Sequence, residues 1–141
     1  MIRLAVAMML AAGALPALGQ PASEPTLYDQ LGGETGIGRI VDGLLRRSVE
    51  DPRIKESFED TNIDRLKTLL ATQFCVLSGG PCQYKGRTMK ASHAALGLHA
   101  RHLDALVEDL QDAMSAERVP FRVQNRLLAL LAPMRDDVVT K

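Results

Sequence analysis

Three histidines and two cysteines are the side chains in this 141-residue chain that most readily bind metals or form covalent bonds. His93 lies among Met89, Ala94 and Leu96, and this apolar setting predicts that it faces inward from a helix. An inward-facing histidine is either a hydrogen-bonded core residue or a metal ligand, since neutral imidazole suits iron well. From spacing alone, both interpretations stay open.

The other two histidines, His99 and His102, are three residues apart and can share one face of a helix. Such a pair is compatible with zinc, but a structural zinc site needs further cysteine, histidine or carboxylate ligands. We therefore expect two solvated residues at the start of a helix.

The two cysteines, Cys75 and Cys82, are separated by the end of a predicted helix and by Gly79-Gly80-Pro81. A chain that doubles back there brings them within bonding reach, and outside the reducing cytosol they can pair. We expect a disulfide. Neither a Cys-x-x-Cys redox pair nor a Cys-x-x-Cys-His haem attachment motif is present in the sequence.

Residues 1–19 have the pattern of a secretory signal peptide: a positive start at Arg3, an apolar run over 4–15, and small residues before Gln20. The run is short for a membrane span, which needs roughly 20 apolar residues. We expect cleavage after Gly19, export to the periplasm or beyond, and no membrane association afterwards. Residues 20–25 are expected to form a mobile leader before a single domain over 26–141.

The composition limits the function classes. Lysine plus arginine and aspartate plus glutamate each number 17, so the formal charge is zero. A nucleic-acid partner would require a basic surface, so none is expected. Hydrophobic residues make up 46%, enough for one buried core.

Apolar residues recur at intervals of three and four, as in amphipathic helices, in the segments 27–31, 37–49, 63–77, 103–114 and 123–134. No segment alternates apolar and polar residues, so an all-α fold is predicted. Between the third and fourth segments, Gly79-Gly80-Pro81 stops a helix and Gly86 allows another turn. His93 then opens a short helix, and basic Lys85, Arg87 and Lys90 surround this specified loop. Such loops usually position a functional group.

Several pieces resemble the group I truncated haemoglobins, in the same order and spacing. They are Thr26 to Gly33, Asp51-Pro52-Arg53, Phe58, Gly79-Gly80-Pro81, Tyr84, Gly86-Arg87, Met89-Lys90, His93, Pro120 and the tail 133–138. The resemblance covers nearly all of 26–141. It implies a two-over-two helical sandwich around non-covalent haem b, iron protoporphyrin IX.

The resemblance also implies the residues of the haem site. His93 stands at the place of the proximal iron ligand. The positions expected to contact haem are Phe58, Leu66, Leu70, Tyr84, Arg87, Met89, Lys90 and Leu103. Arg87, Lys90 and Tyr84 are placed to meet the propionates, although the two basic residues are equally compatible with a solvated surface.

The distal side departs from the family pattern. A tyrosine of the second helix and a glutamine of the third commonly hydrogen-bond oxygen in this family, and their places hold Leu45 and Leu70 here. Leu66 occupies another pocket position, and Leu69 stands where some relatives supply a sixth iron ligand. We therefore expect an apolar distal wall and a five-coordinate or water-bound iron, with Gln73 as a nearby polar side chain.

The function expected from the resemblance is reversible binding of a diatomic gas: oxygen, nitric oxide or carbon monoxide. One alternative is a haem enzyme, a nitric oxide dioxygenase or a peroxidase-like protein, which would use a redox partner. Another is a haem-free helical domain that acts through partners. Absorption spectra separate these readings.

Overall fold

The computed structural model describes residues 23–141. The predicted signal peptide and the first part of the predicted leader lie outside the described residues. Within 23–141 the structure contains helices and no strand, and no helix is long and apolar enough to cross a membrane. The prediction of an all-α fold is confirmed.

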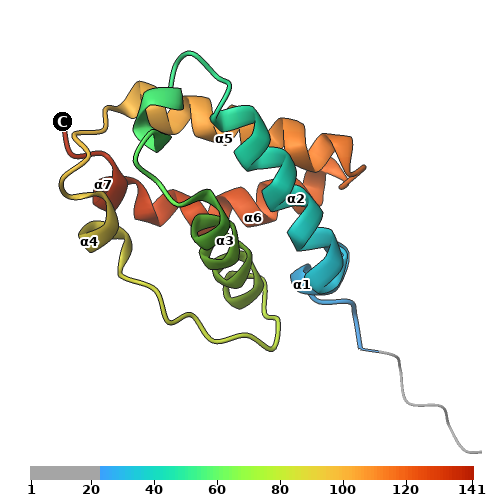
Figure 1. Cartoon of the computed structure of the whole chain (residues 1–141). Coiled ribbons are helices and arrows are strands. Elements are labelled where there is room, and N and C mark those ends of the chain that lie inside the picture. The colour runs from blue at the N-terminus through green and yellow to red at the C-terminus, as the bar shows by residue number, and fades with distance from the viewer. Residues whose placement is uncertain (1–22) are drawn as a thin grey trace, which may run out of the picture.

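The helical elements follow one another along the chain with short connections, apart from the long loop after the third helix. They are α1 (Leu27–Gln30), α2 (Gly33–Ser48), η1 (Lys55–Phe58), α3 (Ile63–Leu77), α4 (Met89–His93), α5 (Ala100–Ala116), α6 (Phe121–Leu131), η2 (Ala132–Met134) and α7 (Arg135–Val138). The η elements are single turns of 3-10 helix. Figure 1 shows this order from the N-terminal to the C-terminal end of the fold.

Four long helices build the fold as two layers. Helix α2 packs against both α3 and α5, and α6 closes the bundle against α3 and α5 (Figure 1). The core between them is almost entirely aliphatic. Its fully buried side chains include Ile37, Ile40, Val41, Leu44, Met114 and Leu127. This is the predicted two-over-two arrangement.

Side-chain caps begin three of the helices. The side chain of Thr26 accepts a hydrogen bond from the backbone N–H of Asp29 (3.1 Å), and the carboxylate of Asp29 accepts one from the N–H of Thr26 (2.9 Å). At α3, the Asn62 side chain accepts from the N–H of Arg65 (2.9 Å). The Thr88 hydroxyl caps α4 similarly. Each cap satisfies a backbone donor that the helix leaves unpaired.

Two boundaries differ from the expected ones. Helix α2 begins at Gly33, because Gly32 adopts a left-handed conformation (φ +88°) and turns the chain directly from α1 into α2. Helix α4 begins at Met89, so His93 is its last residue instead of its first. Because the side chains of a helix tilt toward its N-terminus, the ring of His93 lies over the turn that starts at Met89.

A proline interrupts the last helical segment. Pro133 lies in η2, where the chain tightens into a 3-10 turn between α6 and α7. Helix α7 then packs against α4 (Figure 1). The final residues return to the segment before α5, where the N–H groups of Thr140 and Lys141 donate to the carbonyl of Leu98 (2.9 and 3.1 Å). The C-terminal end therefore supports the helix that carries His93.

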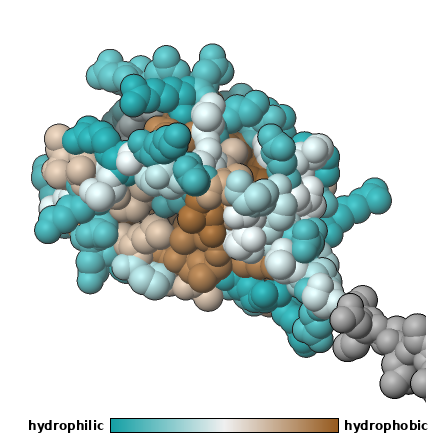
Figure 2. Space-filling model, turned by 90° about the horizontal axis from the view of Figure 1, so that it is seen from below, coloured by the Kyte–Doolittle hydropathy of each residue, from teal (hydrophilic) through white to brown (hydrophobic). Residues whose placement is uncertain are grey.

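The surface on the α3 side of the molecule is not uniformly polar. Seen from below the view of Figure 1, apolar surface gathers in the middle of the face and hydrophilic side chains surround it (Figure 2). Soluble domains usually expose apolar groups singly. A continuous apolar strip of this kind is typical of a ligand-binding groove or an interaction site.

Candidate functional site

A cavity of about 290 Å³ borders His93. It lies among α3, α4, the start of α5 and the turn η1, and its walls are mostly aliphatic. The lining residues are Leu45, Ile54, Ser57, Phe58, Thr61, Leu66, Leu69, Leu70, Gln73, Tyr84, Met89, Ser92, His93, Leu96, Leu98, His102, Leu103, Leu106 and Val138. We call it the histidine cavity.

A second cavity, of about 550 Å³, adjoins the first toward α5, α6 and α7. The residues common to the two linings are Leu70, Gln73, Met89, His93, Leu103, Leu106 and Val138. Because both spaces meet at these side chains, they form two parts of one apolar interior region. Ligand sites of this kind are concave and largely apolar, with a few polar groups that fix orientation.

His93 is held in one orientation by its own helix. Its Nδ1 atom lies 2.7 Å from the carbonyl oxygen of Met89. A carbonyl only accepts hydrogen bonds, so in the neutral ring Nδ1 carries the proton and Nε2 keeps its lone pair. A metal-binding histidine commonly has this arrangement, in which a backbone carbonyl fixes the tautomer and the ring direction.

Most of the residues that the sequence suggested for haem contact lie around this space. Phe58, Leu66, Leu70, Tyr84, Met89, His93 and Leu103 all line the histidine cavity. Arg87 and Lys90 are exposed and do not belong to either lining. The Tyr84 hydroxyl donates to the carbonyl of Arg87 (3.0 Å), which braces the loop before α4. A contact of Arg87 or Lys90 with propionates stays a prediction.

The four expected distal leucines all line the histidine cavity, and we call them the leucine wall. Leu45 comes from α2, and Leu66, Leu69 and Leu70 come from α3. Leu45 is only 4% exposed. These four side chains cannot donate hydrogen bonds, so this wall offers a guest molecule only van der Waals contact.

Gln73 is the polar side chain of α3 that the structure brings inward. It is 8% exposed and borders both cavities. Its Nε2 atom lies 3.3 Å from the sulfur of Met89 and 3.4 Å from that of Met134. Thioether sulfur is a weak acceptor, so this amide ties α3 to α4 and η2 by weak hydrogen bonds.

The histidine pair at the start of α5 has a local role. The N–H of His99 donates to Nδ1 of His102 (3.0 Å), and burial together with nearby Arg101 lowers the pKa of His99. Among residues 23–141, no group of three or more histidine, cysteine or acidic side chains could hold a metal ion. The sequence did not reveal that His102 lines the histidine cavity; its position four residues before Leu106, on the same face of α5, was the available signal.

Other lining residues also escaped the sequence interpretation. Ser92 precedes His93 in the single-turn helix α4, and Leu96 and Leu98 lie in the short connection to α5. Ile54 and Ser57 come from the turn before α3. These segments are too irregular for a helical period to assign an inward face. Only the packing of the turns against the bundle places them at the cavity.

Cys75 and Cys82 are joined by a disulfide in the structure, with their Cα atoms 6.0 Å apart. Cys75 is buried on α3, two residues after Gln73, and Cys82 lies in the loop that leads to Tyr84 and α4. The bond therefore attaches the loop that precedes His93 to the helix that carries the leucine wall.

Comparison with known proteins gives one consistent result. The model of the bacterial-like globin family matches residues 26–140. The group 1 truncated hemoglobin GlbN of Mycolicibacterium paratuberculosis is 31% identical over 121 residues, which cover 86% of this chain and 87% of that protein. The crystal structure of truncated hemoglobin from Tetrahymena pyriformis in its Fe(III) form superposes with a TM-score of 0.79 at 29% identity, over 83% of this chain and 100% of that one.

A further neighbour bears on the fold alone, because its identity is only 24%. It is the 2/2 hemoglobin from Synechococcus sp. PCC 7002, in the cyanomet state and with covalently attached heme. Its TM-score is 0.76, and the match covers 83% of this chain and 100% of that one.

Proposed function

Because this chain belongs to the bacterial-like globin family, among the group 1 truncated haemoglobins, we infer that it is a haem globin that binds a diatomic gas. We propose that the gas binds at a five-coordinate, non-covalent haem b held by His93. The observation that carries the proposal is the hydrogen bond from Nδ1 of His93 to the Met89 carbonyl. It leaves Nε2 free at the edge of an apolar cavity. When bound, ferrous haem supplies the site that takes the gas.

The residues around His93 fit such a group. Phe58 comes from η1 and Leu103 from α5, and Met89 lies one turn before the histidine. Burying a large, flat, mostly apolar ligand among these side chains removes apolar area from water, at about 25 cal/mol for each Å². The carboxylates of the ligand would remain at the surface near Tyr84.

The leucine wall affects how strongly each gas is held. Leu45, Leu66 and Leu70 donate no hydrogen bond to a gas, and Leu69 cannot coordinate iron. Oxygen depends on such a donor more than carbon monoxide or nitric oxide does. We therefore expect oxygen to dissociate rapidly and the open coordination position to stay accessible, with Gln73 as the nearest polar side chain.

The experiment is absorption spectroscopy of the ferric, ferrous, oxygen-bound and carbon-monoxide-bound protein, with a His93→Gly variant. We expect a Soret band and a five-coordinate ferrous spectrum. The variant should lose that spectrum and regain it when free imidazole is added, because imidazole replaces the missing ligand. His102→Ala is the matched control, since His102 lines the same cavity and should leave the spectrum unchanged. A His93→Gly protein with the native spectrum would contradict the assignment.

Two finer parts of the proposal have separate tests. Acid butanone should extract all haem from the protein; haem that remains with the polypeptide would mean covalent attachment, as in the Synechococcus neighbour.

We further propose export, from the signal-like residues 1–19. Sequencing the N-terminus of the protein made in a bacterial host should then give Gln20 as the first residue, and a retained Met1 would refute this.

A further inference from the structure

We propose that the disulfide between Cys75 and Cys82 controls how long this protein keeps its haem, and that reduction of the bond lets the haem pass to an acceptor; this rests on the proposed function. The bond joins the last turn of α3 to the loop that leads to α4, the helix of His93. We call residues 81–88 of this loop the proximal loop. The sequence has no third cysteine, so no other thiol of the chain can exchange with the bond.

The proximal loop has few other attachments. Its residues 81–87, all described in the structure, form no backbone-to-backbone hydrogen bond. Tyr84 lines the histidine cavity, but its hydroxyl donates to the carbonyl of Arg87 within the same loop (3.0 Å). Figure 1 shows the loop running along the outside of the bundle from α3 to α4. The disulfide is therefore the strongest attachment of this loop to α3, because it is covalent.

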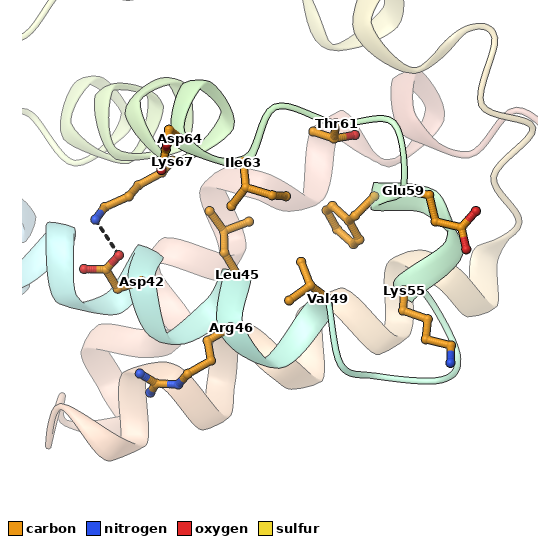
Figure 3. A pocket seen from close by; sticks show the side chains of 11 residues that line it. Asp42, Leu45, Arg46, Val49, Lys55, Glu59, Thr61, Ile63, Asp64 and Lys67 are labelled. Atoms are coloured by element: carbon orange, nitrogen blue, oxygen red, sulfur yellow. Dashed lines mark ion pairs between the residues drawn. The ribbon is translucent and has the colours of Figure 1, made fainter.

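Helix α3 stays in place without the bond. The turn at its end is closed by a hydrogen bond from the N–H of Gly80 to the carbonyl of Cys75 (2.8 Å). The helix also packs against α2, and Lys67 forms an ion pair with Asp42 of α2 (2.5 Å; Figure 3). Reduction of the bond should therefore free the proximal loop and leave the bundle intact.

The side chains proposed to hold haem are divided between the two elements that the bond links. The leucine wall lies mostly on α3, whereas Met89 and His93 lie on α4. A large ligand held between two elements leaves when they separate. With the bond formed, only residues 83–88 connect its end to α4; after reduction, residues 78–88 connect α3 to α4. The entropy cost of closing a loop rises with its length, so reduction favours the separated state.

Two contacts continue to hold α4 after reduction. Helix α7 packs against it, and Nε2 of Gln73 lies 3.3 Å from the sulfur of Met89. Both contacts are non-covalent, and a hydrogen bond to a thioether is weak. We therefore expect reduction to loosen α4 and speed the loss of haem, without unfolding the protein.

The chemical step is thiol–disulfide exchange with an external thiol. Its thiolate attacks the sulfur of Cys82, since Cys82 is half-buried whereas Cys75 is only 3% exposed. The disulfide breaks, the sulfur of Cys75 leaves and takes up a proton, and a second external thiol then releases Cys82 in the same way. The protein gains two electrons and two protons, and two external thiols become one disulfide. In the oxidising compartment expected for an exported protein, the bond stays formed and haem is kept.

The test follows the transfer of haem from the ferric protein to an excess of apomyoglobin by absorption. Native protein is measured before and after treatment with dithiothreitol, beside a variant with both Cys75→Ser and Cys82→Ser. We expect reduction and the double substitution each to raise the transfer rate by about tenfold, or roughly 1.4 kcal/mol. The double variant is also the control for effects of dithiothreitol on the iron, because its rate should not respond to the reductant. Equal rates before and after reduction of the native protein would overturn the proposal.

Glycine insertions distinguish a tether from a general gain in stability. Three glycines inserted after Gln83 lengthen the chain between the bond and α4, and should speed haem transfer from the oxidised protein by about twofold. Three glycines inserted after Pro81 lie within the bridged segment, so they should leave the rate of the oxidised protein unchanged. Equal rates for these two oxidised variants would contradict the tether.

Hydrogen exchange gives a measurement that does not depend on bound haem. In α4 and its end, the N–H of Ser92 donates to the carbonyl of Thr88 (2.9 Å) and that of Ala94 to the carbonyl of Lys90 (3.0 Å). In the haem-free protein, reduction should speed the exchange of these amides and leave those of α6 unchanged. Unchanged exchange in α4 would refute the tether. A native protein that takes up no haem refutes the proposed function itself, whereas a normal Soret band with equal haem transfer in both redox states refutes this inference alone.

Discussion

Ser48 and Asp109 form a buried pair between α2 and α5, and removing the serine hydroxyl should destabilise the protein in a pH-dependent way. The Ser48 hydroxyl donates to the carboxylate of Asp109 (2.9 Å), with Ser48 fully buried and Asp109 7% exposed. Burial raises the pKa of Asp109, while the hydrogen bond from Ser48 lowers it. Neighbouring Asp51 and Asp112 raise this pKa further and Arg53 lowers it, but Ser48 lowers it more than Arg53 does.

The sign follows from proton binding. Because the pKa of Asp109 is raised in the folded state, the folded protein holds this proton more tightly than the unfolded chain. Its contribution to stability is fully present below the ordinary aspartate pKa and is lost as the pH rises through the folded value. Ser48→Ala removes a donor to the ionised carboxylate and raises the folded pKa further, so the loss caused by the mutation grows with pH.

The magnitude follows from the type of hydrogen bond. A hydrogen bond to a charged group contributes about 1.5–3 kcal/mol, and one between neutral groups about 0.5–1.5 kcal/mol. We therefore expect Ser48→Ala to cost about 1.5–3 kcal/mol when Asp109 is ionised and about half as much when it is protonated. For a domain of this size, the larger loss lowers Tm by roughly 6–12 °C.

Urea unfolding followed by circular dichroism measures this loss at several values from about pH 4 to about pH 8. Neither Ser48 nor Asp109 lines the cavities, so haem binding cancels in the comparison at matched haem saturation. Ser78→Ala is the control: its buried hydroxyl donates to the carbonyl of Phe74 (2.6 Å), an uncharged acceptor. Losses for the two variants that are equal and independent of pH would show the reasoning about Asp109 to be wrong.

Further predictions concern the leucine wall and the disulfide. Leu70→Gln puts an amide donor into the wall and should slow oxygen dissociation by about tenfold, the effect of a hydrogen bond of roughly 1.4 kcal/mol, while carbon monoxide dissociation changes little. Stopped-flow measurement, with Leu70→Met as an apolar control of similar volume, tests this; equal oxygen rates in both variants would contradict it. Replacing Cys75 and Cys82 together by serine should lower stability by about 2–3 kcal/mol, because the bond closes a short loop. Urea unfolding of this double variant measures the loss, and native protein treated with a reductant should match it.

Sequence reasoning determined the helices and the key residue of the site, because both depend on local chemistry. Thr26, Asn62 and Thr88 begin helices by accepting backbone hydrogen bonds only three residues away. The apolar period then indicates each buried face, whatever it packs against. His93 was identified from the loop before it and from the resemblance, and the structure adds the hydrogen bond that fixes its tautomer.

Only the tertiary structure decided which side chains meet. Ser48 and Asp109 are 61 residues apart, and a helical period assigns each to a face without naming its partner. The weak hydrogen bonds of Gln73 likewise depend on how α3, α4 and η2 pack. Contacts between distant segments result from the packing of the whole core, so no local pattern in the chain encodes them. For that reason the sequence could predict the leucine wall of this globin, whereas the partners of Gln73 beside it became visible only in the folded chain.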